Sequence, residues 1–139
     1  YRGYHSDITR TICIGHADER QKECYDAILT AQKTALAAIR AGVTGVAVDE
    51  AARNILRKYN LNQYFGHGLG HSLGLEIHEE PRLSKFGKDT MRTNMLITDE
   101  PGVYIPGWGG IRIEDTVLVT ETAGEPLTHA PKEFIEICI

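Results

Sequence analysis

Apolar residues recur with helical spacing after Asp18 and predict a long amphipathic helix in the first third of the chain. Asp18 and Gln21 match a capping box, in which two side chains satisfy free backbone N–H groups at a helix start. The pattern stops at Gly42, a residue type that is common at helix ends. Its apolar positions are Tyr25, Ile28, Leu29, Leu36 and Ile39. We interpret this helix as structural.

A second, shorter helix is predicted after a Val-Thr-Gly turn, because the apolar positions again repeat with a helical period. Those positions are Val48, Ala51, Ala52, Ile55, Leu56 and Tyr59. Arg53, Arg57 and Lys58 fall on the polar side of this helix. We expect all three to be solvated, since surface charges of this kind contribute little to stability.

From Ser84 onward the helical period is absent, and short apolar runs alternate with turn residues, which is typical of a sheet. The runs with strand character are Met95–Thr98, Val103–Ile105 and Ile111–Thr120. Residues 1–15 predict a strand or hairpin arm, and the Phe134–Ile139 tail is expected to pair or pack at an edge. No repeat, low-complexity segment or linker divides the chain, so residues 1–139 predict one α+β domain.

Composition narrows the classes of function. The chain has 139 residues and a net charge of −4 without a basic run, which argues against nucleic acid or an anionic membrane as partner. No apolar stretch has the length of a membrane span, and no signal-peptide pattern precedes Tyr1. The three cysteines show no CxxC spacing, so neither a disulfide framework nor a zinc knuckle is indicated, and a reducing, cytoplasmic compartment is expected. Small molecules or peptides are the expected partners.

The stretch from Tyr64 to Arg82 has an unusual density of glycine and histidine. It contains His67, His71 and His78 together with several glycines, a composition that fits neither a helix nor an ordinary strand. Glycines allow a close approach of the backbone or a positive φ, and imidazoles are the commonest protein ligands of transition metals. This stretch therefore predicts a metal site.

Three carboxylates are candidates for the same site. Glu100 lies in a turn fixed by Pro and Gly, and Glu114 interrupts a strand of Ile and Val. Taken singly, Asp7 is interpreted as a solvated strand residue, and Glu114 as the ion-pair partner of Arg112 on a solvent face. Taken with His71, these carboxylates form a ligand set of mostly oxygen donors, which suits Mn²⁺, Fe²⁺ or Co²⁺ and, less well, Zn²⁺.

Four ordered motifs extend this hypothesis, because together they resemble the proline-specific branch of the "pita-bread" metallopeptidases of the M24 type. That branch contains Xaa-Pro dipeptidase (prolidase) and aminopeptidase P. The motifs are SDITRT at Ser6–Thr11, HGLGHSLGLEIHE at His67–Glu79, DEPGVY at Asp99–Tyr104 and GGIRIED at Gly109–Asp115. The methionine aminopeptidases fit less well, since their histidine motif lacks the leading histidine at the place of His67.

The resemblance implies a fold and an activity. The fold would be the C-terminal portion of the pita-bread (creatinase/aminopeptidase) fold, a curved antiparallel sheet packed by two helices. The activity would be metal-dependent hydrolysis of the Xaa-Pro bond, in dipeptides or at peptide N-termini. Proline-containing peptides would be the partners, and a homo-oligomer is compatible with the family. The first part of the family's catalytic domain and its N-terminal domain would precede Tyr1, so the chain resembles a partial domain that could be inactive alone.

The resemblance also assigns metal ligands. Asp7 and Glu114 would each bridge two divalent ions, with Mn²⁺ expected and Co²⁺, Fe²⁺ or Zn²⁺ as alternatives. His71 and Glu100 would complete the shell of the first ion. The fifth family ligand, an aspartate about eleven residues before the position of Asp7, would fall before Tyr1, so the second ion would lack one ligand.

The remaining roles are implied in the same way. Glu100 would act as the general base that later passes the proton to the leaving amine. His78 would donate a hydrogen bond to the substrate carbonyl or its oxyanion, and His67 would line the pocket for proline. Arg112 would orient a carboxylate.

Two alternatives stand beside the peptidase hypothesis. Some proteins with this fold have lost metal ligands and bind peptides or partners, and a chain without one ligand aspartate could behave in that way. A creatinase-like C–N hydrolase would use the fold without the metal pair, and retention of Asp7, Glu100 and Glu114 argues against it.

Other notable residues have ordinary interpretations. His5, His16 and His129 are expected at the surface or in local hydrogen bonds, and Cys13 and Cys24 as small buried residues. For Trp108 and Tyr104 the alternatives are a pocket wall, core packing or a loop anchor.

Overall fold

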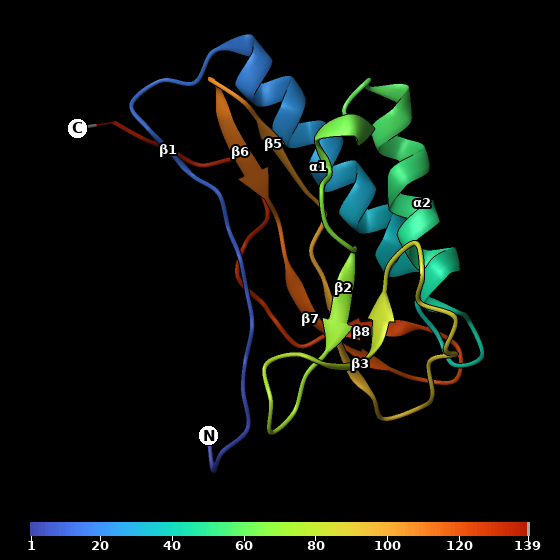
Figure 1. Ribbon diagram of the computed structural model, residues 1–139. Coiled ribbons are helices and arrows are strands. Elements are labelled where there is room, and N and C mark those ends of the chain that lie inside the picture. The colour runs from blue at the N-terminus through green and yellow to red at the C-terminus, as the bar shows by residue number, and fades with distance from the viewer. Residues whose placement is uncertain (139) are drawn as a thin grey trace.

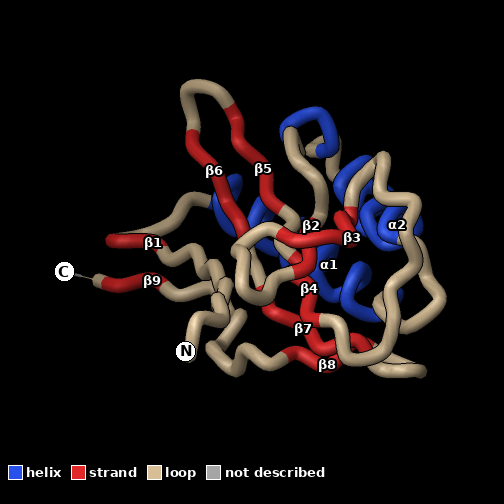
Figure 2. Tube along the Cα trace, turned by 60° about the horizontal axis from the view of Figure 1, so that its bottom comes forward, coloured by secondary structure: helices blue, strands red, loops and turns tan. Residues whose placement is uncertain are grey.

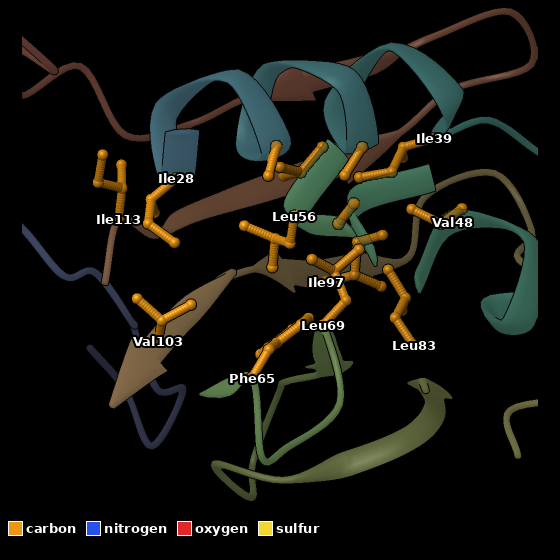
Figure 3. Packing of buried hydrophobic residues seen from close by; sticks show 14 of the residues in the cluster. Ile28, Ile39, Val48, Leu56, Phe65, Leu69, Leu83, Ile97, Val103 and Ile113 are labelled. Carbon is orange, nitrogen blue, oxygen red and sulfur yellow. The ribbon is translucent and has the colours of Figure 1, made fainter. Parts of the chain in front are cut away.

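Two helices cover one face of an antiparallel sheet in the computed structural model, which describes residues 1–138 (Figure 1). The helices α1 (Glu19–Ala38) and α2 (Gly45–Lys58) pack against each other above the strands. Apolar side chains from both layers meet between them (Figure 3). Those labelled in the figure are Ile28, Ile39, Val48, Leu56, Phe65, Leu69, Leu83, Ile97, Val103 and Ile113. The α+β prediction is therefore confirmed.

Both helices begin at side-chain caps. The carboxylate of Asp18 accepts a hydrogen bond from the backbone N–H of Gln21 at 2.7 Å, and the Gln21 side chain accepts from the N–H of Asp18 at 2.9 Å. These bonds confirm the predicted capping box. At α2, Thr44 Oγ1 accepts from the N–H of Ala47 at 3.3 Å. No helix among residues 1–138 is long and apolar enough to cross a membrane.

The central sheet has five strands in the order β3-β2-β4-β7-β8, and every neighbouring pair is antiparallel. The strands are β2 (Gly70–Ser72), β3 (Glu79–Leu83), β4 (Leu96–Asp99), β7 (Asp115–Val119) and β8 (Gly124–Pro126). A short 3-10 helix, η1 (Asn62–Tyr64), leads from α2 into the glycine-rich stretch. Part of that stretch is a strand after all, because Gly70 lacks a Cβ that would collide with the carbonyl oxygen of Thr98.

The predicted strand Ile111–Thr120 is wrong as one continuous element. β5 (Gly102–Ile105) and β6 (Gly109–Arg112) form a separate hairpin, and the central sheet resumes only at β7. Between them the backbone N–H of Glu114 donates to the carbonyl of Thr9 at 3.0 Å. The backbone pairs with β5 up to Arg112, with Thr9 at Glu114, and with β4 from Asp115 onward. The strand is therefore interrupted, although the alternation of apolar and polar residues continues in the sequence.

Two short strands, one from the first fifteen residues and one from the C-terminal tail, lie side by side. Within residues 1–15 only β1 (Cys13–Ile14) is a strand, and it pairs in parallel with β9 (Glu136–Ile137) (Figure 2). The edge pairing predicted for the Phe134–Ile139 tail is confirmed for its described part, and Ile139 lies outside the described residues. The segment before β1 contacts the sheet through an isolated antiparallel bridge between Thr9 and Glu114.

One prediction about the second helix is wrong. Arg57 and Lys58 are exposed as expected, but Arg53 is only 2% exposed and pairs with Asp49 at 2.7 Å. Arg53 is buried by a tertiary contact, because the glycine-rich segment after η1 folds back over this side of α2. The helical period of the sequence cannot predict that a distant segment will bury a polar position of the helix.

Candidate metal centre

The sheet brings the four predicted ligands together from four separate parts of the chain. His71 lies in β2, Glu100 follows β4, Glu114 precedes β7, and Asp7 lies on the N-terminal segment that runs beside β7 (Figure 1). His71 Nε2 is 3.2 Å from Glu100 Oε1 and 3.8 Å from Asp7 Oδ2. The order of the strands, and not the order of the residues, creates this cluster.

Glu114 is the most deeply buried carboxylate of the cluster, with 2% exposure. Its Oε2 accepts a hydrogen bond from Thr9 Oγ1 at 2.5 Å, whereas its Oε1 is buried without a hydrogen-bond partner among the described residues. Burial, together with the charges of Glu100 and Asp7, outweighs the Thr9 hydrogen bond and raises the pKa of Glu114 to about 7. A buried acceptor without a donor is costly, and a cation would satisfy it.

The ring of His71 is oriented by its own strand. Its Nδ1 lies 3.0 Å from the carbonyl of Ser72, which can only accept, so Nδ1 carries the hydrogen. Nε2 therefore faces the carboxylates of Glu100 and Asp7. Burial lowers the pKa of His71, but the Glu100 hydrogen bond and the nearby charges outweigh it and leave the pKa raised. Positive charge is favoured at this point, either as a proton on Nε2 or as a cation bound by its lone pair.

Glu100 is held by Thr98, two residues earlier. Thr98 Oγ1 donates to Glu100 Oε1 at 3.0 Å and accepts from the backbone N–H of His71 at 3.0 Å. Burial raises the pKa of Glu100, but hydrogen bonds from His71 and Thr98 outweigh it and leave the pKa below its usual value. Glu100 is thus an ionised carboxylate at neutral pH, as a ligand or a base must be.

The donor set fits a divalent cation by its chemistry. It consists of three carboxylates and one imidazole, and one buried oxygen, Glu114 Oε1, has no other partner among the described residues. However, no group of three or more His, Cys, Asp and Glu side chains within residues 1–138 is already arranged to hold an ion. His71 and Glu100 contact each other directly at 3.2 Å. Two atoms that each ligate one divalent ion at about 2.1 Å lie about 3 Å apart, so this distance already suits two ligands of one ion.

An open pocket of about 380 Å³ lies over this cluster. It is lined by His67, Gly68, Gly70, His71, His78, Arg82, Ser84, Glu100 and Arg112. The rings of His78 and His71 meet edge to face, with centroids 4.4 Å apart. All three histidines of the glycine-rich stretch therefore face one cavity, whereas His5, His16 and His129 do not line it.

A chain of hydrogen bonds links the pocket wall to Glu114. His67 Nε2 lies 3.1 Å from the hydroxyl of Tyr104, and Arg112 Nη1 donates to the same hydroxyl at 3.1 Å. Arg112 Nε donates to Thr9 Oγ1 at 2.9 Å, and Thr9 in turn donates to Glu114. Arg112 thus reaches Glu114 mainly through Thr9, since its own Nε is 4.0 Å from Glu114 Oε2.

Sequence reasoning passed over Thr9 and Thr98 as functional residues and left Tyr104 undecided. All three hydroxyls orient predicted site residues. Their only sequence signal is position, because Thr9 lies inside SDITRT, Tyr104 lies inside DEPGVY, and Thr98 directly precedes DEPGVY. Trp108 does not line the pocket, and its ring lies 4.9 Å from the guanidinium of Arg20. Cys24 is buried as expected, and burial raises the pKa of its thiol against the opposing charge of Arg20.

A second acidic pair lies behind the ligands. Asp99 and Asp115 are cross-strand partners on β4 and β7 and are both fully buried. One amide nitrogen of Gln32 on α1 donates to both, at 3.0 and 3.1 Å. Burial raises the pKa of Asp115, but hydrogen bonds from Lys132, Thr128 and Arg10 outweigh it and lower the pKa below its usual value.

The partner carboxyl behaves in the opposite way. Burial and the charge of Asp115 raise the pKa of Asp99 well above its usual value. The two carboxyl groups adjacent in sequence to Glu100 and Glu114 therefore have pKa values shifted in opposite directions, upward for Asp99 and downward for Asp115.

Known proteins resemble this chain in both sequence and fold. The profile of metallopeptidase family M24 matches residues 1–121. The Xaa-Pro dipeptidase of Pyrococcus horikoshii is 48% identical over 135 residues, which cover 97% of this chain and 38% of that protein. Among solved structures, the Xaa-Pro dipeptidase from Bacillus anthracis superposes with a TM-score of 0.96 at 44% identity, covering 99% of this chain and 39% of the other.

A third relative is named for a different activity. The X-Pro aminopeptidase from Thermotoga maritima superposes with a TM-score of 0.95 at 40% identity, covering 99% of this chain and 38% of the other. The chain thus spans about two fifths of the length of the proteins it matches. Its fold is that of one portion of these proteins, as the four motifs predicted.

Proposed function

Because this chain belongs to metallopeptidase family M24, we propose that it is the metal-binding portion of a peptidase that hydrolyses Xaa-Pro bonds. The observation that carries the proposal is the buried Oε1 of Glu114, which has no hydrogen-bond partner within residues 1–138. Glu114 lies within reach of the charges of Glu100 and Asp7, and both of these carboxylates contact His71. The names of the relatives, Xaa-Pro dipeptidase and X-Pro aminopeptidase, support the choice of substrate. Xaa-Pro dipeptides and longer peptides that begin with Xaa-Pro are the substrate class.

The ligand roles are part of the proposal. Asp7 and Glu114 would contact two ions, and His71 and Glu100 would complete the shell of one of them. Mn²⁺ is the ion we expect, because oxygen donors with a single imidazole suit it. Divalent ions supply Lewis acidity, which makes water a nucleophile near neutral pH and polarises the scissile carbonyl.

The chain's own residues would then move the proton and orient the substrate. Glu100, with its lowered pKa, accepts the proton of the attacking water and passes it to the leaving amine. His78 stands against His71 at the pocket wall and donates a hydrogen bond to the carbonyl oxygen as negative charge develops there. His67, held by Tyr104, lines the space for the proline ring.

Arg112 would act as a positioning residue. Its guanidinium fixes Thr9, whose hydroxyl orients Glu114, and it also fixes the hydroxyl of Tyr104 beside His67. One residue thus connects a ligand with the wall of the proline pocket. Hydrogen bonds behind a ligand of this kind orient it and tune its basicity.

A second candidate function is a peptide-binding module without catalysis. The observation that favours it is that no three of the candidate ligands among residues 1–138 are already arranged around one point. Such a module would bind proline-led peptides in the same pocket, with or without a metal ion.

The test combines metal binding with turnover. The chain is stripped with a chelator, titrated with Mn²⁺ in a calorimeter, and then incubated with Ala-Pro and with a longer Ala-Pro-led peptide, whose products are separated by chromatography. The peptidase proposal expects saturable binding of Mn²⁺ by this chain, and release of alanine when the remaining portion of the peptidase is present. In Glu100→Gln we expect turnover to fall by about 1000-fold or more, because base and ligand are lost together.

Glu121→Gln is the matched control, because Glu121 is an exposed acid in the turn after β7. Its Mn²⁺ affinity and turnover should equal those of the unchanged chain. Saturable peptide binding without product would favour the binding module. Equal turnover by Glu100→Gln would reject the role assigned to Glu100.

A further inference from the structure

A buried ion pair on α2 lies directly beneath the segment that carries His67. Asp49 and Arg53 are one helical turn apart and are 1% and 2% exposed. Arg53 Nε donates to Asp49 Oδ2 at 2.7 Å, and Nη2 donates to Oδ1 at 3.2 Å. Removing two charges from water is costly, so such a pair persists only when its remaining hydrogen-bonding groups are also satisfied.

Those remaining groups bind the backbone of Phe65–Leu69. Arg53 Nη1 donates to the carbonyl of Phe65 at 3.1 Å, and Nη2 donates to the carbonyl of His67 at 2.5 Å. Asp49 Oδ1 accepts from the N–H of Leu69 at 3.0 Å. The pair therefore holds three alternate residues of one segment, and the Arg53 guanidinium also lies 4.2 Å from the centre of the Phe65 ring.

The segment lies outside the helices and strands. η1 ends at Tyr64 and β2 begins at Gly70, so sheet pairing does not fix Phe65–Leu69. On its other side, a Cβ at Gly68 would lie 2.8 Å from the carbonyl oxygen of Leu83, so only glycine fits between the segment and β3. Figure 3 shows Phe65 and Leu69 turned toward the apolar core.

The held backbone reaches two residues of the candidate site. His67 projects from the segment to the hydroxyl of Tyr104, with its ring edge to face against Phe65. The carbonyl of Leu69 accepts from the backbone N–H of Glu100 at 2.8 Å. A shift of this segment would therefore displace both the pocket histidine and the proposed base.

We infer that Asp49 and Arg53 are positioning residues, which fix the backbone of Phe65–Leu69 and thereby place His67 and Glu100 for the reaction. The importance of that placement for peptide hydrolysis rests on the proposed function. The placement itself does not, because it is a property of the fold and can be measured without metal or substrate.

Two variants separate the geometry of the pair from its charge. Asp49→Leu combined with Arg53→Met removes both charges, and such apolar replacement of a buried ion pair commonly leaves the fold intact. Arg53→Lys keeps a charge for Asp49, but one ammonium group cannot span the carbonyls of Phe65 and His67 as the planar guanidinium does. The matched control is Glu50→Gln with Arg57→Met, which removes an exposed ion pair of the same helix.

The first measurement is amide hydrogen exchange at Glu100 in the chelator-stripped chain. Its N–H is bonded to Leu69 and is not touched by the pair. In both Arg53 variants we expect exchange at Glu100 to accelerate about tenfold or more relative to Ile28 in α1, and the ring signals of His67 to shift in NMR spectra. The Glu50/Arg57 control should change neither.

Each outcome has a consequence. Equal acceleration at Glu100 and Ile28 would mean that the pair serves only overall stability, and this result would overturn the inference. Unchanged exchange and unchanged His67 signals in the folded double variant would overturn it as well. The exchange measurement needs no metal, so failure of the chain to bind Mn²⁺ would count against the proposed function alone.

Discussion

At the scale of single residues, burial of Glu114 creates an electrostatic conflict that depends on pH. The pKa of Glu114 in the folded chain is raised to about 7, whereas an unfolded glutamate ionises at about pH 4.3. For an acid with a raised folded-state pKa, stability is greatest below the unfolded pKa and is lost as pH rises through the folded pKa. Ionisation of Glu114 thus works against the fold between these two values.

We therefore expect the chelator-stripped chain to lose up to about 3 kcal/mol of unfolding free energy through Glu114 as pH rises from about 4.5 to about 7.5. In Glu114→Gln, whose amide does not titrate, this part of the pH dependence should be absent. Urea unfolding at several pH values measures the difference between the two chains. An identical pH dependence in both would show that Glu114 ionises freely.

The two histidines that meet edge to face should respond differently to truncation. His71→Ala removes the only proposed nitrogen ligand, so Mn²⁺ affinity should fall by about 100-fold or more. His78→Ala should leave Mn²⁺ affinity nearly unchanged and lower the rate of Ala-Pro hydrolysis by about 100-fold, since a hydrogen bond to the developing oxyanion is lost. Calorimetry and product assays separate the two effects. Loss of the metal from His78→Ala would make His78 a ligand.

At the scale of elements, a polar contact inside the core joins α1 to the sheet. Gln32 is fully buried and donates to Asp99 and Asp115, while Lys132 donates to its Oε1 at 3.2 Å. The helix is thereby fixed against β4 and β7 directly behind Glu100 and Glu114. An apolar residue would pack in this place but would leave the two acids with one donor fewer.

Gln32→Leu should lower the free energy of unfolding by about 2 kcal/mol, because buried acceptors lose their shared donor. Chemical denaturation measures this change. Lys33→Leu, at the exposed neighbouring position, is the control and should change stability by less than about 0.5 kcal/mol. A Gln32→Leu chain as stable as the original would mean that Lys132, Thr128 and Arg10 satisfy Asp115 by themselves and that Asp99 needs no donor from α1.

At the scale of the whole molecule, the candidate ligands span most of the sequence. Asp7 and Glu114 are joined through Thr9, while Arg10 binds Asp115 at 2.7 Å and the carbonyls of Ala130 and Pro131. Unfolding any layer would separate the ligands, so metal binding and global stability should be linked.

Saturating Mn²⁺ at about 100 times its dissociation constant should raise the free energy of unfolding by about 2.7 kcal/mol for one ion. The increase should appear in a single cooperative urea transition and should disappear on addition of a chelator. His71→Ala is the control, because with about 100-fold weaker binding its increase should be no more than about 0.4 kcal/mol. An equal increase in that variant would point to nonspecific binding by the acidic surface.

The sequence by itself determined the two helices and the α+β class, and it named the candidate site residues. Both helices were predicted from periodicity and caps, since helical hydrogen bonds and capping are local in the chain. The motifs predicted the family and named Asp7, His71, Glu100 and Glu114, because the residue types alone carry the ligand chemistry.

Only the tertiary structure decided how these residues are surrounded. It buried Arg53 under the glycine-rich segment, broke the strand between Arg112 and Asp115, and left Glu114 Oε1 without a partner among the described residues. Burial, strand exchange and pKa depend on segments far apart in the chain that meet only in the fold. No local pattern can therefore encode them, and the physical state of each site residue follows from the packing around it.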